Sequence, residues 1–182
     1  MASVTYKAQP AIDKTSGSVP LEGTEYPYRV TRLLWNDEVH IAINKLLQGR
    51  SLHVCCGHSR MGDVWVDMNP EVKPDFIADA ARLPFKNESF DTVFCDPPYN
   101  GKMQWNHDML SELSRVAASR IIFQHWFIPA NQNRHYKKAH RFRLTEIYAW
   151  QGQTYFGRAQ LISVFDSIPK TTDLFGEERY ET

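Results

Sequence analysis

The chain concentrates chemically useful residues in one short stretch, DPPYN, at positions 96–100. It follows an apolar run, FDTVFC at 90–95, whose composition predicts a strand. Asp96 supplies a carboxylate that accepts hydrogen bonds, the two prolines fix the backbone, and Tyr99 offers a flat ring. Two prolines after a strand can also simply end it. The acid before them and the aromatic after them favour a functional site.

Polar residues also follow three other predicted strands. The strand at 51–56 leads into the loop CCGHSRMG, the strand at 63–68 contains Asp67 near its end, and the strand at 74–79 ends at Asp79. Ligands of α/β sheets bind beyond the carboxyl ends of the strands. The convergence of four such strand ends predicts a binding crevice at this edge of the sheet.

The remaining apolar pattern predicts helices and further strands. Helical spacing indicates a helix over about 29–49, with Gly49 as its C-cap, and another over 103–117. A fifth strand is predicted at 120–127, and two final strands, at about 142–150 and 159–166, flank the hairpin connection QGQTYFG. This alternation predicts an α/β fold whose sheet is mostly parallel, with one antiparallel strand from the C-terminal hairpin.

The first two crossovers of this sheet are unusually short. Eight residues lie between Cys55 and Val64, and six between Met68 and Asp75. A parallel crossover normally needs a dozen or more residues, usually including a helix. We therefore expect these crossover helices to be reduced to turns, which would leave one face poorly covered near the second and third strands. Residues 1–25 or a second subunit could cover that face.

Composition predicts one core-bearing domain at 26–168. The Ser-, Gly- and Pro-containing stretch at 1–25 reads as a flexible arm, and 169–182 as a frayed acidic tail. Three cysteines, an odd number, lie in strand-like segments without metal-ligand spacing, and the histidines show none either. We expect reduced, buried thiols, no metal, no membrane segment and a cytoplasmic protein. The cysteines are Cys55, Cys56 and Cys95.

One basic stretch interrupts a chain whose formal net charge is zero. Residues 131–143 hold five basic residues and no acid, so they form either a solvated surface or a surface that contacts phosphates. The basic residues are Arg134, Lys137, Lys138, Arg141 and Arg143.

The segments LHVCCG, VDMNP and DAARLPFKNESFDTVFCDPPYN, in that order, resemble class I S-adenosylmethionine-dependent methyltransferases. DPPYN is similar to the motif of amino-methyltransferases that act on nucleic-acid bases, typified by DNA adenine-N6 methyltransferases. The resemblance covers about residues 50–127 and implies a three-layer, Rossmann-like methyltransferase fold. It also implies S-adenosyl-L-methionine as the cofactor.

The chain departs from this family in two places. His53 stands where family members often carry an acid, and of the usual glycine triplet only Gly57 is kept, with Cys55 and Ser59 at the other positions. About twenty residues separate Asn100 from the fifth strand, which leaves no room for a target-recognition segment.

The resemblance assigns cofactor contacts to the four strand ends. Cys55 and Gly57 would approach the cofactor, as would Asp96. Asp67, followed by Met68, would accept hydrogen bonds from the ribose hydroxyls. Asp79, followed by Ala80, would accept one from the adenine amine. Each of these acids is also a common turn former or helix cap.

Asp96, Pro97, Pro98 and Tyr99 would form the catalytic motif. An aromatic amine is a poor nucleophile because its lone pair is delocalised into the ring. The Asp96 carboxylate and the Pro97 carbonyl would accept its two N–H bonds, while Tyr99 stacks on the base. Substrate contacts are also expected from a wider set: Asn100, Arg134, Lys137 and Lys138. The aromatic residues Trp105, His125, Trp126 and Phe127 are interpreted as core or pocket wall.

The resemblance favours methylation of an exocyclic base amine, with adenine N6 in DNA first. Alternatives are an RNA methyltransferase, on adenine N6 or guanine N2, and a non-catalytic subunit of an active partner. The absent recognition segment is consistent with a homodimer or with a separate specificity partner.

Overall fold

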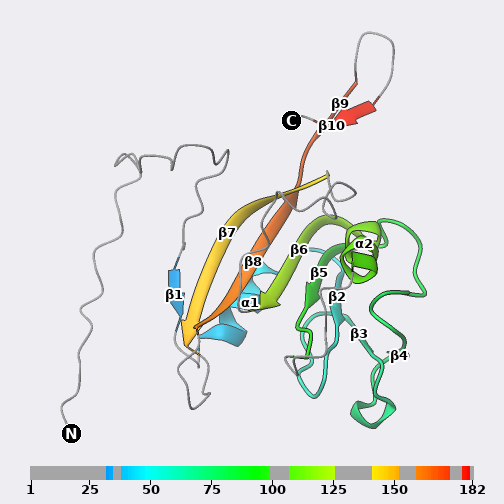
Figure 1. Ribbon diagram of the computed structural model, residues 1–182, viewed down its shortest axis with the longest axis vertical. Coiled ribbons are helices and arrows are strands. Elements are labelled where there is room, and N and C mark those ends of the chain that lie inside the picture. Colours follow the sequence, from blue (N-terminus) through cyan, green and yellow to red (C-terminus); the bar gives the residue numbers. More distant parts are fainter. Residues whose placement is uncertain are drawn as a thin grey trace, which may run out of the picture.

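The computed structural model describes residues 32–34, 38–98, 107–125, 141–151, 159–172 and 178–180. These residues form an eight-stranded sheet in the order β1-β7-β8-β6-β5-β2-β3-β4 and a separate two-stranded sheet, β9–β10 (Figure 1). The strands are β1 (Arg32–Leu34), β2 (Ser51–Val54), β3 (Val64–Asp67), β4 (Phe76–Ile77), β5 (Phe90–Cys95), β6 (Ala117–His125), β7 (Phe142–Gln151), β8 (Ala159–Ser167), β9 (Lys170–Thr172) and β10 (Glu178–Tyr180).

The pairing confirms the expected mostly parallel sheet. Strands β4, β3, β2, β5 and β6 pair in parallel, and β8 lies antiparallel between β6 and β7. All four residues of β2 are buried, as are five of the six in β5. Burial on both faces is typical of a central parallel strand and explains why these segments read as apolar runs.

Two helices cover different parts of the sheet. Helix α2 (His107–Val116) buries Met109, Leu113 and Val116, and these side chains belong to a core cluster with Val93 and Cys95 of β5. Helix α1 (Val39–Leu46) buries Val39, Ile43 and Leu46 in a second cluster with Phe94. Because successive strand residues point to opposite faces, the two helices pack on opposite faces of the sheet.

The shortened crossovers are confirmed. Residues 55–63 contain no helix, and the next crossover holds only the 3₁₀ helix η1 (Pro70–Val72). Beyond it, β4 has two residues, and the side chains of Phe76 and Ile77 are exposed. The sheet edge at β4 is therefore poorly covered within the described residues, as the spacing predicted.

The predicted helix over about 29–49 is wrong at both ends. Residues 32–34 instead form β1, which pairs in parallel with β7, and α1 begins only at Val39. The helix ends at Leu46, and Leu47 is already extended. Gly49 adopts a φ of +58° in the following turn, where an added Cβ would lie 2.2 Å from an Asp91 carboxylate oxygen. Gly49 is therefore required by this close approach and is not the helix cap.

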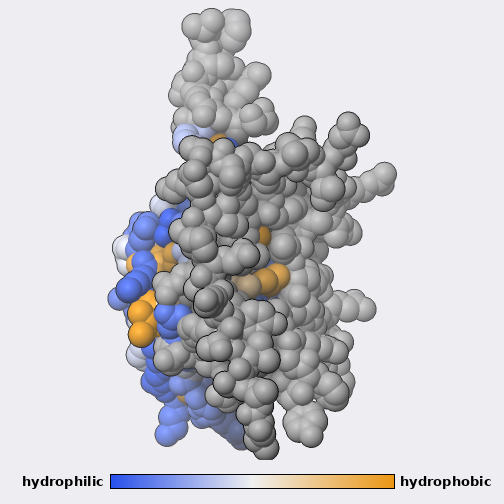
Figure 2. All heavy atoms as spheres, turned by 90° about the vertical axis from the view of Figure 1, so that its left-hand side faces the viewer, coloured by the Kyte–Doolittle hydropathy of each residue, from blue (hydrophilic) through white to orange (hydrophobic). Residues whose placement is uncertain are grey.

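The C-terminal region is more regular than a frayed tail. Strands β9 and β10 pair antiparallel, with Lys170 opposite Tyr180, and extend away from the main sheet (Figure 1). The main C-terminal hairpin, β7 and β8, lies where the sequence predicted it. On the face shown in Figure 2, the described surface is mostly hydrophilic, with small hydrophobic spots.

Candidate cofactor crevice and amine-binding motif

The strand order reverses between β2 and β5, and this switch point brings together the chain segments that leave β2, β3 and β5. The chain leaves β2 through Cys55 and leaves β5 through Asp96, whose backbone N–H donates to the Val54 carbonyl over 3.3 Å. Strand β3 joins the same edge, because the Cys56 N–H donates to the Val66 carbonyl over 3.1 Å. Crevices at such switch points are the usual ligand sites of α/β sheets.

The loop after β2 provides a close backbone approach. Gly57 has a φ of +51°, and a Cβ built on it would meet no atom within 4 Å. Crowding by other atoms therefore does not explain why this position is a glycine. The open space in front of this backbone, called the Gly57 cradle below, would allow a ligand to approach closely.

Asp67 connects the first two loops. Its Oδ2 accepts the Gly57 N–H at 2.8 Å, and its Oδ1 accepts the Asn69 N–H at 2.8 Å. An ionised carboxylate has about four acceptor positions, so two remain after these bonds. They suit a ligand with two hydroxyls. The next side chain, Met68, is 69% exposed and offers an apolar surface beside this carboxylate.

Asp79 forms a turn, which is one of the two roles expected for it. Its Oδ1 accepts the Ala81 N–H at 2.9 Å, and its carbonyl accepts the Arg82 N–H at 2.8 Å. The side chain remains exposed, whereas Ala80 packs partly buried against the α2-side core. The same carboxylate therefore closes a turn and keeps acceptor capacity toward solvent.

The motif at the end of β5 is described as far as Pro98. Asp96 is partly buried, Pro97 is buried and Pro98 is exposed. Pro97 anchors this turn in the protein while Asp96 stays accessible at the switch point. The predicted roles of Tyr99 and Asn100 fall outside the described residues, as do Trp105, Trp126 and Phe127.

The three cysteines lie at the end of β5 and directly after β2. Cys56 and Cys95 are buried, but Cys55 is only partly buried, which corrects the expectation of three buried thiols. Burial raises the pKa of the Cys95 thiol well above its ordinary value, and a hydrogen bond with the Cys55 thiol raises it further. Burial and, next, the charge of Asp67 raise the pKa of Cys56 to about 11. Cys55 is thus the accessible thiol.

Two buried histidines flank the switch point. His53 Nδ1 accepts the Met61 N–H at 3.4 Å, which leaves Nε2 as a buried N–H without a hydrogen-bond partner in the described structure. Its ring lies 4.5 Å from that of Phe94, and burial lowers its pKa to about 4. The Nε2 atom is buried, and through Nδ1 His53 supports the loop after β2. The sequence alone gave no indication of the hydrogen bond between His53 and Met61, which are eight positions apart.

His125 belongs to the core, as its strand-end position predicted. It is 2% exposed, its Nε2 lies 3.2 Å from the Ser163 hydroxyl, and burial lowers its pKa to about 3. The sequence analysis missed Ser163, because the antiparallel pairing of β6 with β8 that brings the two residues together leaves no local pattern.

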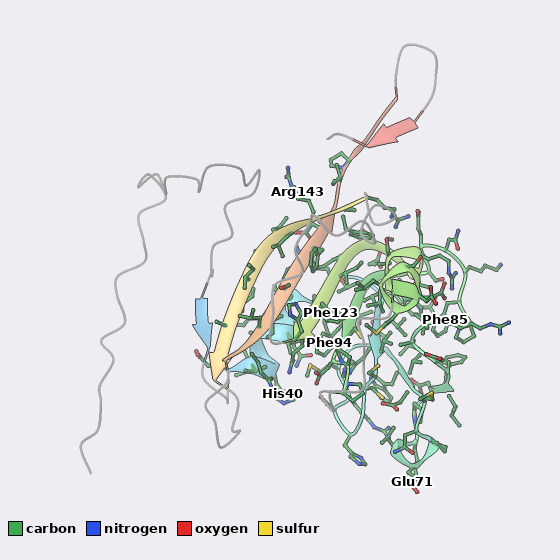
Figure 3. All side chains as sticks on the ribbon, in the orientation of Figure 1. His40, Glu71, Phe85, Phe94, Phe123 and Arg143 are labelled. Carbon is green, nitrogen blue, oxygen red and sulfur yellow. The ribbon has the colours of Figure 1, made fainter. Side chains whose placement is uncertain are left out.

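Two residues of the basic stretch, Arg141 and Arg143, lie in the described structure. Arg141 forms an ion pair with Glu88 and donates to the Ala117 carbonyl. Arg143 pairs with Asp166 in the β7–β8 register, level with the start of β6, and lies at the end of the sheet away from Phe123 (Figure 3). Both arginines are therefore far from the Asp96 edge. Arg134, Lys137 and Lys138 lie outside the described residues.

Two searches of the described part of the chain were negative. No group of three or more His, Cys, Asp or Glu side chains there could hold a metal ion. None of the helices described is long and apolar enough to cross a membrane.

Comparison with known proteins links the chain to others through its fold. No family model matches the sequence, and no curated protein matches it. Among solved structures, the N-methyltransferase NodS from Bradyrhizobium japonicum WM9 is similar with a TM-score of 0.52 and 12% identity, over 72% of this chain and 95% of NodS. The PH0226 protein from Pyrococcus horikoshii OT3 is similar with a TM-score of 0.50 and 13% identity, over 72% and 88%. With this strand order and the antiparallel β8, the chain has a Rossmann-like methyltransferase fold.

Proposed function

We propose that the crevice binds S-adenosylmethionine and that the protein methylates an exocyclic amine of a nucleic-acid base, adenine N6 in DNA first. The observation that carries the proposal is the position of Asp96 and Pro97. They leave β5 at the switch point, beside the Gly57 cradle that Asp67 holds from β3. The methyltransferase fold and the structural similarity to the N-methyltransferase NodS support methyl transfer to a nitrogen atom.

The described residues fit the proposed cofactor. The free acceptor positions of Asp67 suit its ribose hydroxyls, and the exposed Met68 and partly buried Ala80 suit the faces of its adenine. Asp79 keeps an exposed carboxylate for the adenine amine. When bound, S-adenosylmethionine supplies an electrophilic methyl group on a sulfonium centre.

The remaining chemistry belongs to the motif after β5. The Asp96 carboxylate and the Pro97 carbonyl would each accept one N–H of the base amine, which makes the nitrogen more tetrahedral and directs its lone pair outward. The buried Pro97 keeps these acceptors in place before the base arrives. Once methylated, the nitrogen is acidic, so Asp96 need not be a strong base. Tyr99 would stack on the extruded base.

The proposal is tested with labelled S-adenosylmethionine, DNA and RNA oligonucleotides, and mass spectrometry of the resulting nucleosides. We expect N6-methyladenine in DNA, and Asp96→Ala should lower its formation by about 100-fold or more while binding of S-adenosylhomocysteine persists. Glu88→Gln is the matched control, because this exposed carboxylate lies at the opposite edge of the sheet beside Arg141.

The alternatives give different results in the same assay. If the label appeared in RNA alone, on adenine N6 or guanine N2, the protein would be an RNA methyltransferase instead. Failure to bind S-adenosylhomocysteine in calorimetry would indicate a non-catalytic subunit. Full activity of Asp96→Ala on every substrate would overturn the assignment of the motif.

A further inference from the structure

The ends of the neighbouring strands β2 and β5 carry two thiols. Cys95 is the last residue of β5 and is fully buried, and it pairs in register with Val54 of β2. Cys55 follows Val54 directly. With a strand spacing of about 4.8 Å and a rise of about 3.3 Å per residue, their Cα atoms are expected about 6 Å apart. Disulfides form over Cα separations of about 4.4–6.8 Å.

The backbone at Cys55 turns its side chain toward Cys95. Strict alternation would place Cys55 on the face of His53, away from Val54. Its φ of +58° breaks that alternation, and Cys55 instead packs against the core cluster that contains Val54 and Cys95. A non-glycine residue in this conformation costs on the order of 1 kcal/mol. The Cys55 side chain therefore lies against the same buried cluster as Cys95.

We propose that Cys55 and Cys95 form an oxidisable thiol pair whose disulfide impairs the cofactor crevice, with a hydroperoxide as the oxidant. Cys55 is the entry point because it is the partly exposed member of the pair. Regulation through this pair rests on the proposed function of the crevice, whereas formation of the disulfide does not.

The chemistry balances in two steps. The Cys55 thiol loses its proton to solvent and its sulfur attacks one oxygen of hydrogen peroxide, so an S–O bond forms and the O–O bond breaks, giving a sulfenic acid. The leaving hydroxide takes up a proton in place of the one released and departs as the first water. The Cys95 sulfur then attacks the Cys55 sulfur, so the S–S bond forms and the S–O bond breaks. The Cys95 proton leaves with the departing hydroxyl as a second water. Two thiols are oxidised and one peroxide is reduced to two waters.

Disulfide formation should displace the loop after β2. A disulfide bond is about 2.05 Å long, which is more than 1 Å shorter than the contact distance between two unbonded thiols. Cys95 is held in a central, fully buried strand, so Cys55 is the residue that moves. Its movement shifts the adjoining Gly57, whose N–H is held 2.8 Å from Asp67. Both residues belong to the proposed cofactor cradle.

The test is oxidation of the full chain with hydrogen peroxide, followed by peptide mapping of disulfides. A parallel titration measures S-adenosylhomocysteine affinity before and after a reductant is added. We expect a Cys55–Cys95 link, an affinity loss of at least about tenfold, and recovery of both on reduction. Cys95→Ala should bind as the wild type does when reduced and should form no such link. Cys56→Ala is the matched control for loss of a buried thiol, and it should still form the link.

Each other outcome decides against the proposal. Free Cys55 and Cys95 after peroxide treatment, or a Cys55–Cys56 link instead, would overturn the assigned pair. A Cys55–Cys95 link with unchanged affinity would overturn its effect on the crevice. If the reduced protein bound no S-adenosylhomocysteine, the proposed function would fail, while the peptide map would still decide the thiol chemistry.

Discussion

Replacement of the buried His53 by phenylalanine should make the protein less sensitive to acid. Burial lowers the pKa of His53 from 6.5 to about 4, and the side chain is 1% exposed. As the pH falls through 6.5, His53 therefore becomes protonated in the unfolded chain while it stays neutral in the native state. Stability is fully present above the unfolded pKa and is lost as the pH falls toward the native one.

The size of the effect follows from the two pKa values. From about pH 7 to about pH 5, the one-site linkage relation gives a loss of about 2 kcal/mol for His53. His125, whose pKa burial lowers to about 3, contributes a similar loss of about 2 kcal/mol over the same interval. The sum of about 4 kcal/mol is a large part of an ordinary domain stability of about 5–15 kcal/mol. Carboxylates with lowered pKa values, such as Asp63, act at more acidic pH.

Urea unfolding followed by circular dichroism at several pH values measures this loss. His53→Phe keeps a ring against Phe94 and removes the buried N–H that has no partner, but it also leaves the Met61 N–H without its acceptor. Its free energy of unfolding near pH 7 should therefore fall by about 1–3 kcal/mol. Between about pH 7 and about pH 5 it should lose about half as much stability as the wild type. His58→Gln, which removes an exposed histidine from the same loop, is the control. A His53→Phe variant with the wild-type pH dependence would refute the reasoning.

Four further substitutions test the site and its support. Gly57→Ala should lower the free energy of unfolding by only about 1 kcal/mol. It should nevertheless weaken S-adenosylhomocysteine binding, because its Cβ would enter the open cradle. Gly49→Ala should instead lower the free energy of unfolding by about 2–4 kcal/mol, because its Cβ would lie 2.2 Å from an Asp91 carboxylate oxygen. Asp67→Asn has one acceptor oxygen for two backbone N–H groups, so calorimetry should show at least about tenfold weaker binding. Arg115→Ala should lower the free energy of unfolding in urea by about 2 kcal/mol, because the guanidinium donates to the Leu83 and Phe85 carbonyls over 3.0 and 2.7 Å. Equal stability with the exposed Arg82→Ala variant would contradict this.

The central strands and the loops that follow them could be predicted because their signals are local. The apolar run of β5 is buried along almost its whole length, and the residues after β2, β3 and β5 meet at one edge. The short crossovers were also readable, because a count of residues excludes a helix without any knowledge of packing. Sequence reasoning succeeds where burial on both faces leaves few alternatives.

The errors arose where distant segments decide the local structure. Leu33 and Leu34 fitted a helical spacing, but they lie in β1, which pairs with β7 more than a hundred residues later. Arg141 fitted a phosphate-contacting surface, but its guanidinium is occupied by Glu88 and by the Ala117 carbonyl. The positive φ of Cys55 could not be predicted either, because nothing in the neighbouring sequence indicates it. No residue pattern near these positions encodes the partner.

Loss of the first crossover helix transfers the support of the cofactor loop to side chains. Three of the side-chain contacts that hold residues 55–63 come from the neighbouring strands: Asp67 on the Gly57 N–H, His53 on the Met61 N–H, and Trp65, whose indole N–H donates to the Met61 carbonyl over 3.2 Å. Each is a single hydrogen bond, whereas a helix would supply a cooperative set. Protonation of His53 removes one of the three, because Nδ1 can then no longer accept. The acid-sensitive group and the support of the cradle are thus the same residue, so acid should weaken cofactor binding as well as the fold.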